Sequence, residues 1–291
     1  MEQELLRKKL DESGYVYDET LITVLTVALA LGRPLLIEGA AGVGKTEIAK
    51  VMASALDRDL VRLQCYEGLD ESKALYEWNY QKQLLAIQIG MGKDTGTMTK
   101  ELFSEEYLLE RPLLRSIRSE KEVVLLIDEI DKADEEFEAF LLELLSEMQV
   151  TVPELGTVKA KTVPFVVLTS NRARPLSEAL RRRCAYLYIP YPDMEKELAI
   201  LRAKLPHVDD QLCVQVALAV QQLRSSEAIL KKPSIAETLD WAAALDALGI
   251  RELTPDALRK TAGFILKNNE DMAILDQLHP CNGQCGGHSH G

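Results

Sequence analysis

Residues Gly39–Thr46 read GAAGVGKT, directly after the apolar stretch LLIE at 35–38 and directly before the helical stretch TEIAKVMASAL. A glycine-rich loop between a strand and a helix is the setting in which a phosphate-binding loop occurs. The glycines let the backbone curl so that amide N–H groups point at phosphate oxygens, and the helix N-terminus adds its positive dipole end. A simple glycine turn is the alternative. The loop residues that we expect to bind nucleotide are Gly39, Ala40, Ala41, Gly42, Val43, Gly44, Lys45 and Thr46.

Two residues of this loop have distinct expected roles. Lys45 is predicted to reach the β- and γ-phosphates of ATP, and the Thr46 hydroxyl is predicted to hold Mg²⁺. The sequence therefore predicts ATP and Mg²⁺ as cofactors.

A pair of acidic residues follows a second apolar run, VVLLIDEID at 123–131. Burial of that run on both faces suits a central position beside the phosphate loop. Asp128 fits a carboxylate that acts on Mg²⁺ directly or through water, and Glu129 fits the group that orients and deprotonates the attacking water. A solvated acidic turn is the alternative for the pair taken alone.

A polar residue and a run of arginines come after a third apolar run, FVVLTSN at 165–171. Asn171 is placed to contact the γ-phosphate or the attacking water, although an asparagine here could equally form a turn. The segment LSEALRRRC then offers Arg181, Arg182 and Arg183. These form either a solvated basic face or a source of one arginine for a neighbouring subunit's nucleotide, because a guanidinium stabilises the charge of phosphoryl transfer.

The chain alternates between short strand patterns and helical patterns, which predicts a mainly parallel α/β sheet. Asp18 is a candidate N-cap for a helix over 18–31, and apolar spacing predicts a helix over 134–149. Further strands are predicted at 60–64, 123–127, 165–169 and 185–189.

Strand patterns stop after residue 192, and successive helices are expected, including one near Pro233 and one near Pro255. We predict an α/β nucleotide-binding core over 1–192, a small all-α lid over 193–278 and a flexible tail over 279–291.

Composition narrows the functional class. The 291 residues carry 34 basic and 46 acidic side chains, a net charge of −12. That charge disfavours non-specific attraction to nucleic acid or anionic membrane. No apolar run is long enough to span a bilayer, no signal peptide is visible, and scattered cysteines do not resemble a secreted disulfide framework. We expect a cytoplasmic protein with reduced thiols.

The tail concentrates metal-binding side chains, namely Cys281, Cys285, His288 and His290, with His279 nearby. Such donors could bind a thiophilic metal such as Zn²⁺, Cu⁺ or Ni²⁺. The spacing matches no zinc-finger pattern, so a tail without specific affinity is the alternative.

The order GAAGVGKT, LLIDEID, LTSN and SEALRRRC resembles MoxR-type AAA+ ATPases over about residues 15–278. The resemblance implies a P-loop NTPase AAA+ fold, with a three-layer core, five parallel strands, an all-helical lid and nucleotide bound between subunits of a homo-hexamer. It makes VTVPELGTVKA at 150–160 a β-hairpin and places Arg183 at the arginine-finger position, with Arg182 as the fallback. Relatives carry a second-sensor arginine where this chain has Lys232, which either substitutes for it or leaves that contact missing.

Two further segments, RLQCYEGLDESKALYEWNYQKQLL and KKPSIAETLDWA, are similar to the CoxD-like branch, the accessory ATPases for maturation of carbon monoxide dehydrogenase. This resemblance implies a remodelling chaperone that assists cofactor assembly of a molybdenum hydroxylase client, with a von Willebrand factor A domain partner. A nucleic-acid motor and a nucleotide-gated metal-delivery scaffold are the competing functions.

An aromatic stretch, Glu77-Trp78-Asn79-Tyr80, has poor helical periodicity. It is either an exposed contact for a client or partner, or Trp78 packs in the core.

Overall fold

A computed structural model describes residues 3–89, 102–152 and 156–274. The chain divides into two compact units. The sheet unit comprises Met1–Ser13, Tyr17–Gly39 and Lys45–Ile189, and the helical unit comprises Gly14–Val16, Ala40–Gly44 and Pro190–Gly291. The middle of the predicted phosphate loop thus groups with the helical unit.

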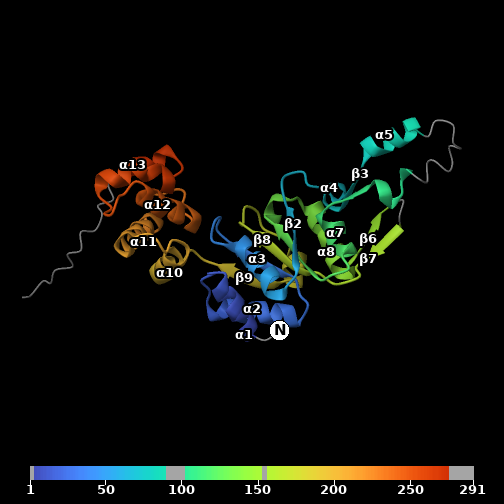
Figure 1. Cartoon of the computed structure of the whole chain (residues 1–291), viewed down its shortest axis with the longest axis horizontal. Coiled ribbons are helices and arrows are strands. Elements are labelled where there is room, and N and C mark those ends of the chain that lie inside the picture. The colour runs from blue at the N-terminus through green and yellow to red at the C-terminus, as the bar shows by residue number, and fades with distance from the viewer. Residues whose placement is uncertain (1–2, 90–101, 153–155, 275–291) are drawn as a thin grey trace, which may run out of the picture. The chain divides into compact units, whose positions relative to one another are not determined.

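Five parallel strands form the main sheet in the order β2-β5-β8-β1-β9. Figure 1 labels β2, β8 and β9 of this sheet. The three central strands are buried along their whole length, which explains their uniformly apolar sequences. Their bounds are β2 Asp59–Gln64, β5 Val123–Asp128, β8 Phe165–Ser170, β1 Leu35–Gly39 and β9 Ala185–Ile189. The predicted α/β fold with a five-stranded parallel sheet is confirmed.

The strand order was not predicted by the sequence. The acidic pair follows β5, which is interior as predicted and brings Asp128 to Thr46 of the phosphate loop, and β8 lies between β5 and the phosphate-loop strand β1. Both β5 and β8 are buried apolar runs, and burial alone does not distinguish which of two such strands pairs with a third.

The helices of the sheet unit begin where the sequence offers caps. Asp18 accepts a hydrogen bond from the Leu21 amide at the start of α2, and Asp134 does the same for Phe137 at the start of α8. The helix predicted over 134–149 is confirmed but ends earlier, because Met148 adopts a left-handed conformation. The helices of this unit are α1 Gln3–Glu12, α2 Glu19–Ala30, α3 Lys45–Leu56, α4 Glu71–Leu75, α5 Tyr80–Ile89, α7 Pro112–Arg118, α8 Glu135–Glu147 and α9 Glu178–Arg183, with 3₁₀ turns η1 Glu105–Tyr107 and η2 Ile130–Lys132.

Two antiparallel ribbons extend the sheet unit. Strands β6 (Gln149–Val152) and β7 (Gly156–Lys159) form the hairpin that the resemblance implied. Strands β3 (Tyr76–Trp78) and β4 (Leu108–Glu110) form a second ribbon that the sequence did not reveal.

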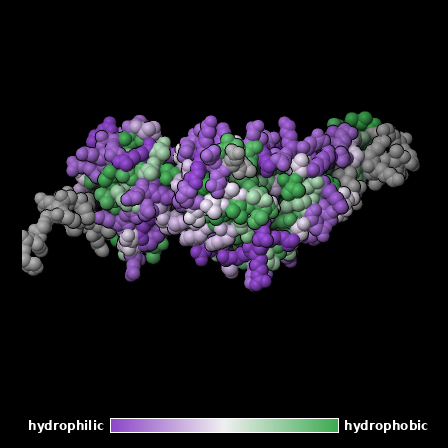
Figure 2. Space-filling model, turned by 90° about the horizontal axis from the view of Figure 1, so that it is seen from below, coloured by the Kyte–Doolittle hydropathy of each residue, from purple (hydrophilic) through white to green (hydrophobic). Residues whose placement is uncertain are grey.

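The aromatic stretch on β3 divides between core and surface. The Trp78 ring packs edge-on against Phe103 with centroids 5.3 Å apart, and Trp78 is 7% exposed. It therefore belongs to the core, whereas Tyr80 is 62% exposed at the start of α5. Leu84 and Ile89 of α5 are also exposed, and Figure 2 shows green hydrophobic surface beside the grey atoms at this end.

The helical unit contains α10 Met194–Lys204, α11 Asp210–Ser225, α12 Ile235–Ala247, α13 Pro255–Ile265 and α14 Asn269–Ile274. The helices predicted near Pro233 and Pro255 are confirmed as α12 and α13. Ser234 and Glu237 form a capping box at the start of α12. Trp241 is fully buried, and its indole donates a hydrogen bond to the Thr261 hydroxyl at 2.7 Å. No helix among the described residues is long and apolar enough to cross a membrane.

Candidate active site

The sequence-predicted residues of the sheet unit meet at one edge of the sheet. Lys45 begins α3 beyond β1, Asp128 is the last residue of β5, and Asn171 directly follows β8. In a parallel sheet the carboxyl ends of the strands share an edge, which is where ligands bind in open α/β folds. Side chains separated by more than 40 residues in the chain are thereby brought within hydrogen-bonding distance.

Lys45 lies at the centre of this edge. Its ammonium donates hydrogen bonds to the Gly39 carbonyl and to Asn171 Oδ1, both at 2.8 Å. Burial lowers the pKa of Lys45, and the negative charges of Asp131, Asp128 and Glu129 oppose that shift. Both of these partner oxygens are neutral, and phosphate oxygens can replace them.

Asp128 is a buried carboxylate that collects donors from three elements. The hydroxyl of Thr46 donates to it at 3.1 Å, the guanidinium of Arg62 on β2 donates through Nε at 3.1 Å and through Nη2, and the Thr169 hydroxyl donates to Oδ1. Adjacent hydroxyl and carboxylate oxygens are the hard ligands that Mg²⁺ prefers, so Thr46 and Asp128 fit that ion.

Glu129 follows in a left-handed conformation with φ of 57°. The Thr169 hydroxyl accepts a hydrogen bond from its backbone N–H at 2.9 Å, which holds this unfavourable conformation. Its carboxylate accepts hydrogen bonds from Gln64 Nε2 at 2.9 Å and Asn171 Nδ2 at 3.3 Å, and pairs with the Lys132 ammonium. The hydrogen bond to Glu129 raises the pKa of Lys132. A carboxylate so placed beside an amide can orient a water molecule.

Three polar residues of this edge were missed by sequence reasoning. Arg62 and Gln64 alternate along β2 and so point to the same side of the sheet, where they reach the acidic pair. Asp131, in η2, is 3% exposed and accepts hydrogen bonds from backbone amides of the loop after β8. The available signals were polar residues at alternate strand positions and a third acid in DEID.

The three arginines of α9 differ in their surroundings. The Arg181 guanidinium is 3.8 Å from buried Glu38 and stacks over Tyr186, while Arg182 pairs with Glu178 one turn away. Arg183 is exposed, and within the described residues it makes no hydrogen bond or ion pair. Of the three, Arg183 has the side chain that is available to another molecule.

The other predicted residues belong to the helical unit or to the tail. Lys232 is in the helical unit, where its ammonium donates to the Ser226 carbonyl. The tail residues Cys281, Cys285, His288 and His290 fall outside the described residues, and within residues 3–89, 102–152 and 156–274 no group of three or more candidate metal ligands occurs.

The sequence profile of the AAA domain, dynein-related subfamily, matches residues 34–184, which run from the start of β1 to the end of α9. The chain belongs to this family. Its residues are 26% identical to YehL of Escherichia coli (strain K12) over 279 residues, covering 85% of this chain and 72% of that protein. They are 27% identical to YojN of Bacillus subtilis (strain 168), covering 69% of this chain and 62% of that protein.

Among solved structures, RuvB from Thermotoga maritima matches with a TM-score of 0.50 and 19% identity, covering 92% of this chain and 75% of that one. At this identity the match bears on the fold alone. Neither the family description nor the relatives' names carry the MoxR-type or CoxD-like assignment, which rests on the sequence motifs.

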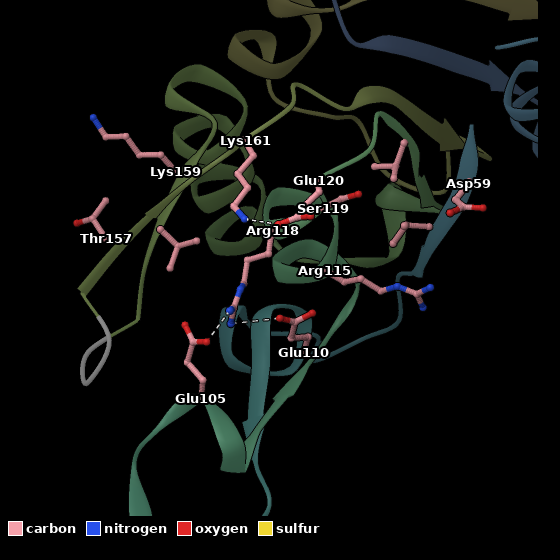
Figure 3. Close-up of a pocket in the computed structure, with 13 residues that line it drawn as sticks. Asp59, Glu105, Glu110, Arg115, Arg118, Ser119, Glu120, Thr157, Lys159 and Lys161 are labelled. Carbon is pink, nitrogen blue, oxygen red and sulfur yellow. Dashed lines mark hydrogen bonds and ion pairs between the residues drawn. The ribbon is translucent and has the colours of Figure 1, made fainter. Parts of the chain in front are cut away.

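The AAA domain also has a cavity of about 750 Å³ at the opposite edge of the sheet, where β2 and β5 begin with Asp59 and Val123. Figure 3 shows Arg118 in this cavity between Glu105 and Glu110, to which it is paired at 2.9 and 3.2 Å. Lys161 is likewise paired with Glu120 at 2.8 Å. Carboxylates thus pair with two of the cations that line the cavity, Arg118 and Lys161.

Proposed function

We propose that this AAA domain hydrolyses ATP to ADP and phosphate with Mg²⁺ at the edge formed by β1, β5 and β8. The observation that carries the proposal is the amide of Asn171, which contacts both the phosphate-loop Lys45 and the water-activating candidate Glu129. One side chain thereby links the group that would bind the γ-phosphate to the group that would activate its attacker.

In the proposed reaction, Lys45 leaves Asn171 and Gly39 to contact the β- and γ-phosphates, while loop amides from Gly39 to Gly44 cradle them. Thr46 and Asp128 would hold Mg²⁺, which would supply positive charge beside the phosphates. Glu129 orients a water molecule and takes its proton as oxygen attacks the γ-phosphorus, and the bond to the β-phosphate oxygen breaks. Asn171 contacts the γ-phosphate or the attacking water.

We further propose that the site is completed by a second subunit, in a homo-hexamer, through Arg183. The support is the exposed, unengaged guanidinium of Arg183 beside two arginines that are engaged within their own chain. A finger supplied in trans contributes about 10³ to 10⁵ in rate in other phosphoryl-transfer proteins. Lys232 is proposed as the second sensor.

A mixing experiment tests the shared site. Arg183→Ala subunits keep a pocket without a finger, and Glu129→Gln subunits keep a finger without a working pocket. Co-assembly of the two inactive proteins should restore hydrolysis. A mixture that co-assembles but stays inactive would show that the finger acts in cis or lies elsewhere, with Arg182 next to be tested.

For the biological role we propose a cytoplasmic remodelling chaperone that assists cofactor assembly of a molybdenum hydroxylase of the carbon monoxide dehydrogenase type, with a von Willebrand factor A domain partner. Support comes from the MoxR-type and CoxD-like resemblance, and the net charge of −12 weighs against a nucleic-acid motor. Disrupting the gene should lower metal-cofactor occupancy of such a hydroxylase, and a Lys45→Ala copy should not restore it. Normal occupancy in the disrupted strain, or hydrolysis stimulated by DNA, would reject the chaperone role.

The tail is proposed to bind a thiophilic metal through Cys281, Cys285, His288 and His290. Metal content after dialysis should be higher in the full chain than in a chain ending at Leu278. Equal content would leave metal delivery without support.

A further inference from the structure

Asp131 is a buried carboxylate that the proposed reaction does not use. It lies in η2, three residues beyond Asp128, and is 3% exposed. Both of its oxygens lie 3.1 Å from the backbone N–H of Asn171, which donates to them, and one oxygen also accepts from the backbone N–H of Ala173 at 2.8 Å. A buried charge is tolerated only where such donors satisfy it, so this carboxylate and this loop stabilise each other.

The loop that Asp131 holds has a conformation that needs support. Between Asn171 and Ala173, Arg172 adopts a positive φ of 62°, which costs free energy for a residue with a side chain. The Arg172 N–H donates to the Ser170 hydroxyl at 3.0 Å, and its neighbours on both sides donate to Asp131. Three consecutive amides are therefore directed by side-chain oxygens as the chain leaves β8.

This backbone determines where the Asn171 side chain lies. Its oxygen accepts from Lys45 and its nitrogen donates to Glu129, so the amide has one orientation and two specific partners. A change in the Asn171 backbone would misplace both contacts at once, even though Asp131 touches neither phosphate nor water.

We propose that Asp131 is a positioning residue that fixes the sensor loop 171–173 and so holds Asn171 between Lys45 and Glu129. The catalytic consequence rests on the proposed ATP hydrolysis, while the fixing of the loop does not.

The first experiment measures hydrogen exchange of backbone amides in the nucleotide-free protein, which requires no activity. Asp131→Asn replaces one acceptor oxygen with an N–H₂ group that faces amide donors, so amides 171–173 should exchange at least about tenfold faster than in the wild type. The matched control is Asp134→Asn, because the Asp134 side chain also accepts a backbone amide, but at the start of α8. The neighbouring Arg174 contacts only the backbone carbonyl of Asp134, which the substitution keeps. It should leave exchange at 171–173 unchanged.

The second experiment is a double-mutant cycle on hydrolysis. Asp131→Asn should lower kcat by about tenfold or more while the dissociation constant for ADP changes less than about threefold, since Lys45 and Thr46 remain. If Asp131 acts through Asn171, the double variant Asp131→Asn/Asn171→Ala should match Asn171→Ala within about twofold. Asp134→Asn should keep the wild-type kcat. Asp131→Glu retains the charge on a longer side chain and should change kcat and amide exchange less than Asp131→Asn does. This variant tests the proposal if Asp131→Asn does not fold.

The outcomes separate the two proposals. Unchanged exchange at 171–173 in both Asp131 variants, or multiplicative losses of kcat in the double variant, would overturn the positioning role. A wild type that does not hydrolyse ATP but shows faster exchange in Asp131→Asn would overturn the proposed reaction and leave the positioning of the loop supported.

Discussion

Replacing Glu129 by glutamine tests the proposed chemistry most directly. The glutamine has the same length and nearly the same shape, and its oxygen can still accept the hydrogen bond from Gln64 or Asn171. It loses the ion pair with Lys132 and the ability to take a proton from water. Lys45 contacts Asn171 and Thr46 contacts Asp128, and Glu129→Gln changes none of these residues, so we expect nucleotide binding to survive.

The expected loss of hydrolysis rate follows from the role of Glu129 as a general base that does not bind the nucleotide. A positioned general base contributes about 10² to 10⁴ in rate. At about 1.4 kcal/mol for each factor of ten, this is roughly 3 to 5 kcal/mol of activation free energy. The lost pair with Lys132 is partly solvent-exposed, with the Lys132 side chain at 49% and that of Glu129 at 29%, so its contribution to folding stability is small.

The assay is single-turnover ATP hydrolysis together with ATP binding measured at the same Mg²⁺ concentration. Glu129→Gln should bind ATP within about threefold of the wild type and cleave it at least about a hundredfold more slowly. Glu135→Gln removes an exposed carboxylate in the first turn of α8 and is the control that should hydrolyse normally. Wild-type cleavage by Glu129→Gln would refute the assignment, as would a loss of rate fully explained by lost affinity.

Three further predictions concern charge at and near the site. Burial lowers the pKa of Lys45, so its charge is lost at a lower pH than that of an ordinary lysine. When ATP affinity is measured from pH 7 to 11, it should therefore begin to decrease at a pH below the usual pKa range of lysine. An affinity that stays constant up to that range would contradict this prediction. Arg62 competes with cations for Asp128, so Arg62→Gln should lower the Mg²⁺ concentration for half-maximal nucleotide binding by about two- to fivefold, whereas an unchanged or higher requirement would count against competition. Burial raises the pKa of Cys65 and of Cys184 to about 12. In a chain with the tail cysteines replaced, both thiols should react with iodoacetamide at pH 8 about a thousandfold more slowly than an exposed thiol. Fast labelling of the folded protein would show that these thiols are accessible.

The sequence by itself determined features that depend on neighbours in the chain. The phosphate loop, the Asp18 cap and the strand runs each need only a few consecutive residues, because backbone propensity, capping and periodicity act over one or two turns. The hairpin at 150–160 came from the family resemblance. The same reasoning identified Lys45, Asp128, Glu129 and Asn171 as candidates, and the structure brings all four to one edge.

Only the tertiary structure decided which strand lies beside which and which side chains hold the site together. Sequence periodicity gives each strand its buried faces but not its partner, so the insertion of β8 between β5 and β1 was invisible. The contacts of Arg62 with Asp128 and of Asp131 with Asn171 join residues 66 and 40 positions apart. Such contacts depend on sheet order and register, which arise from the packing of the whole core and are not encoded in any local stretch of the chain.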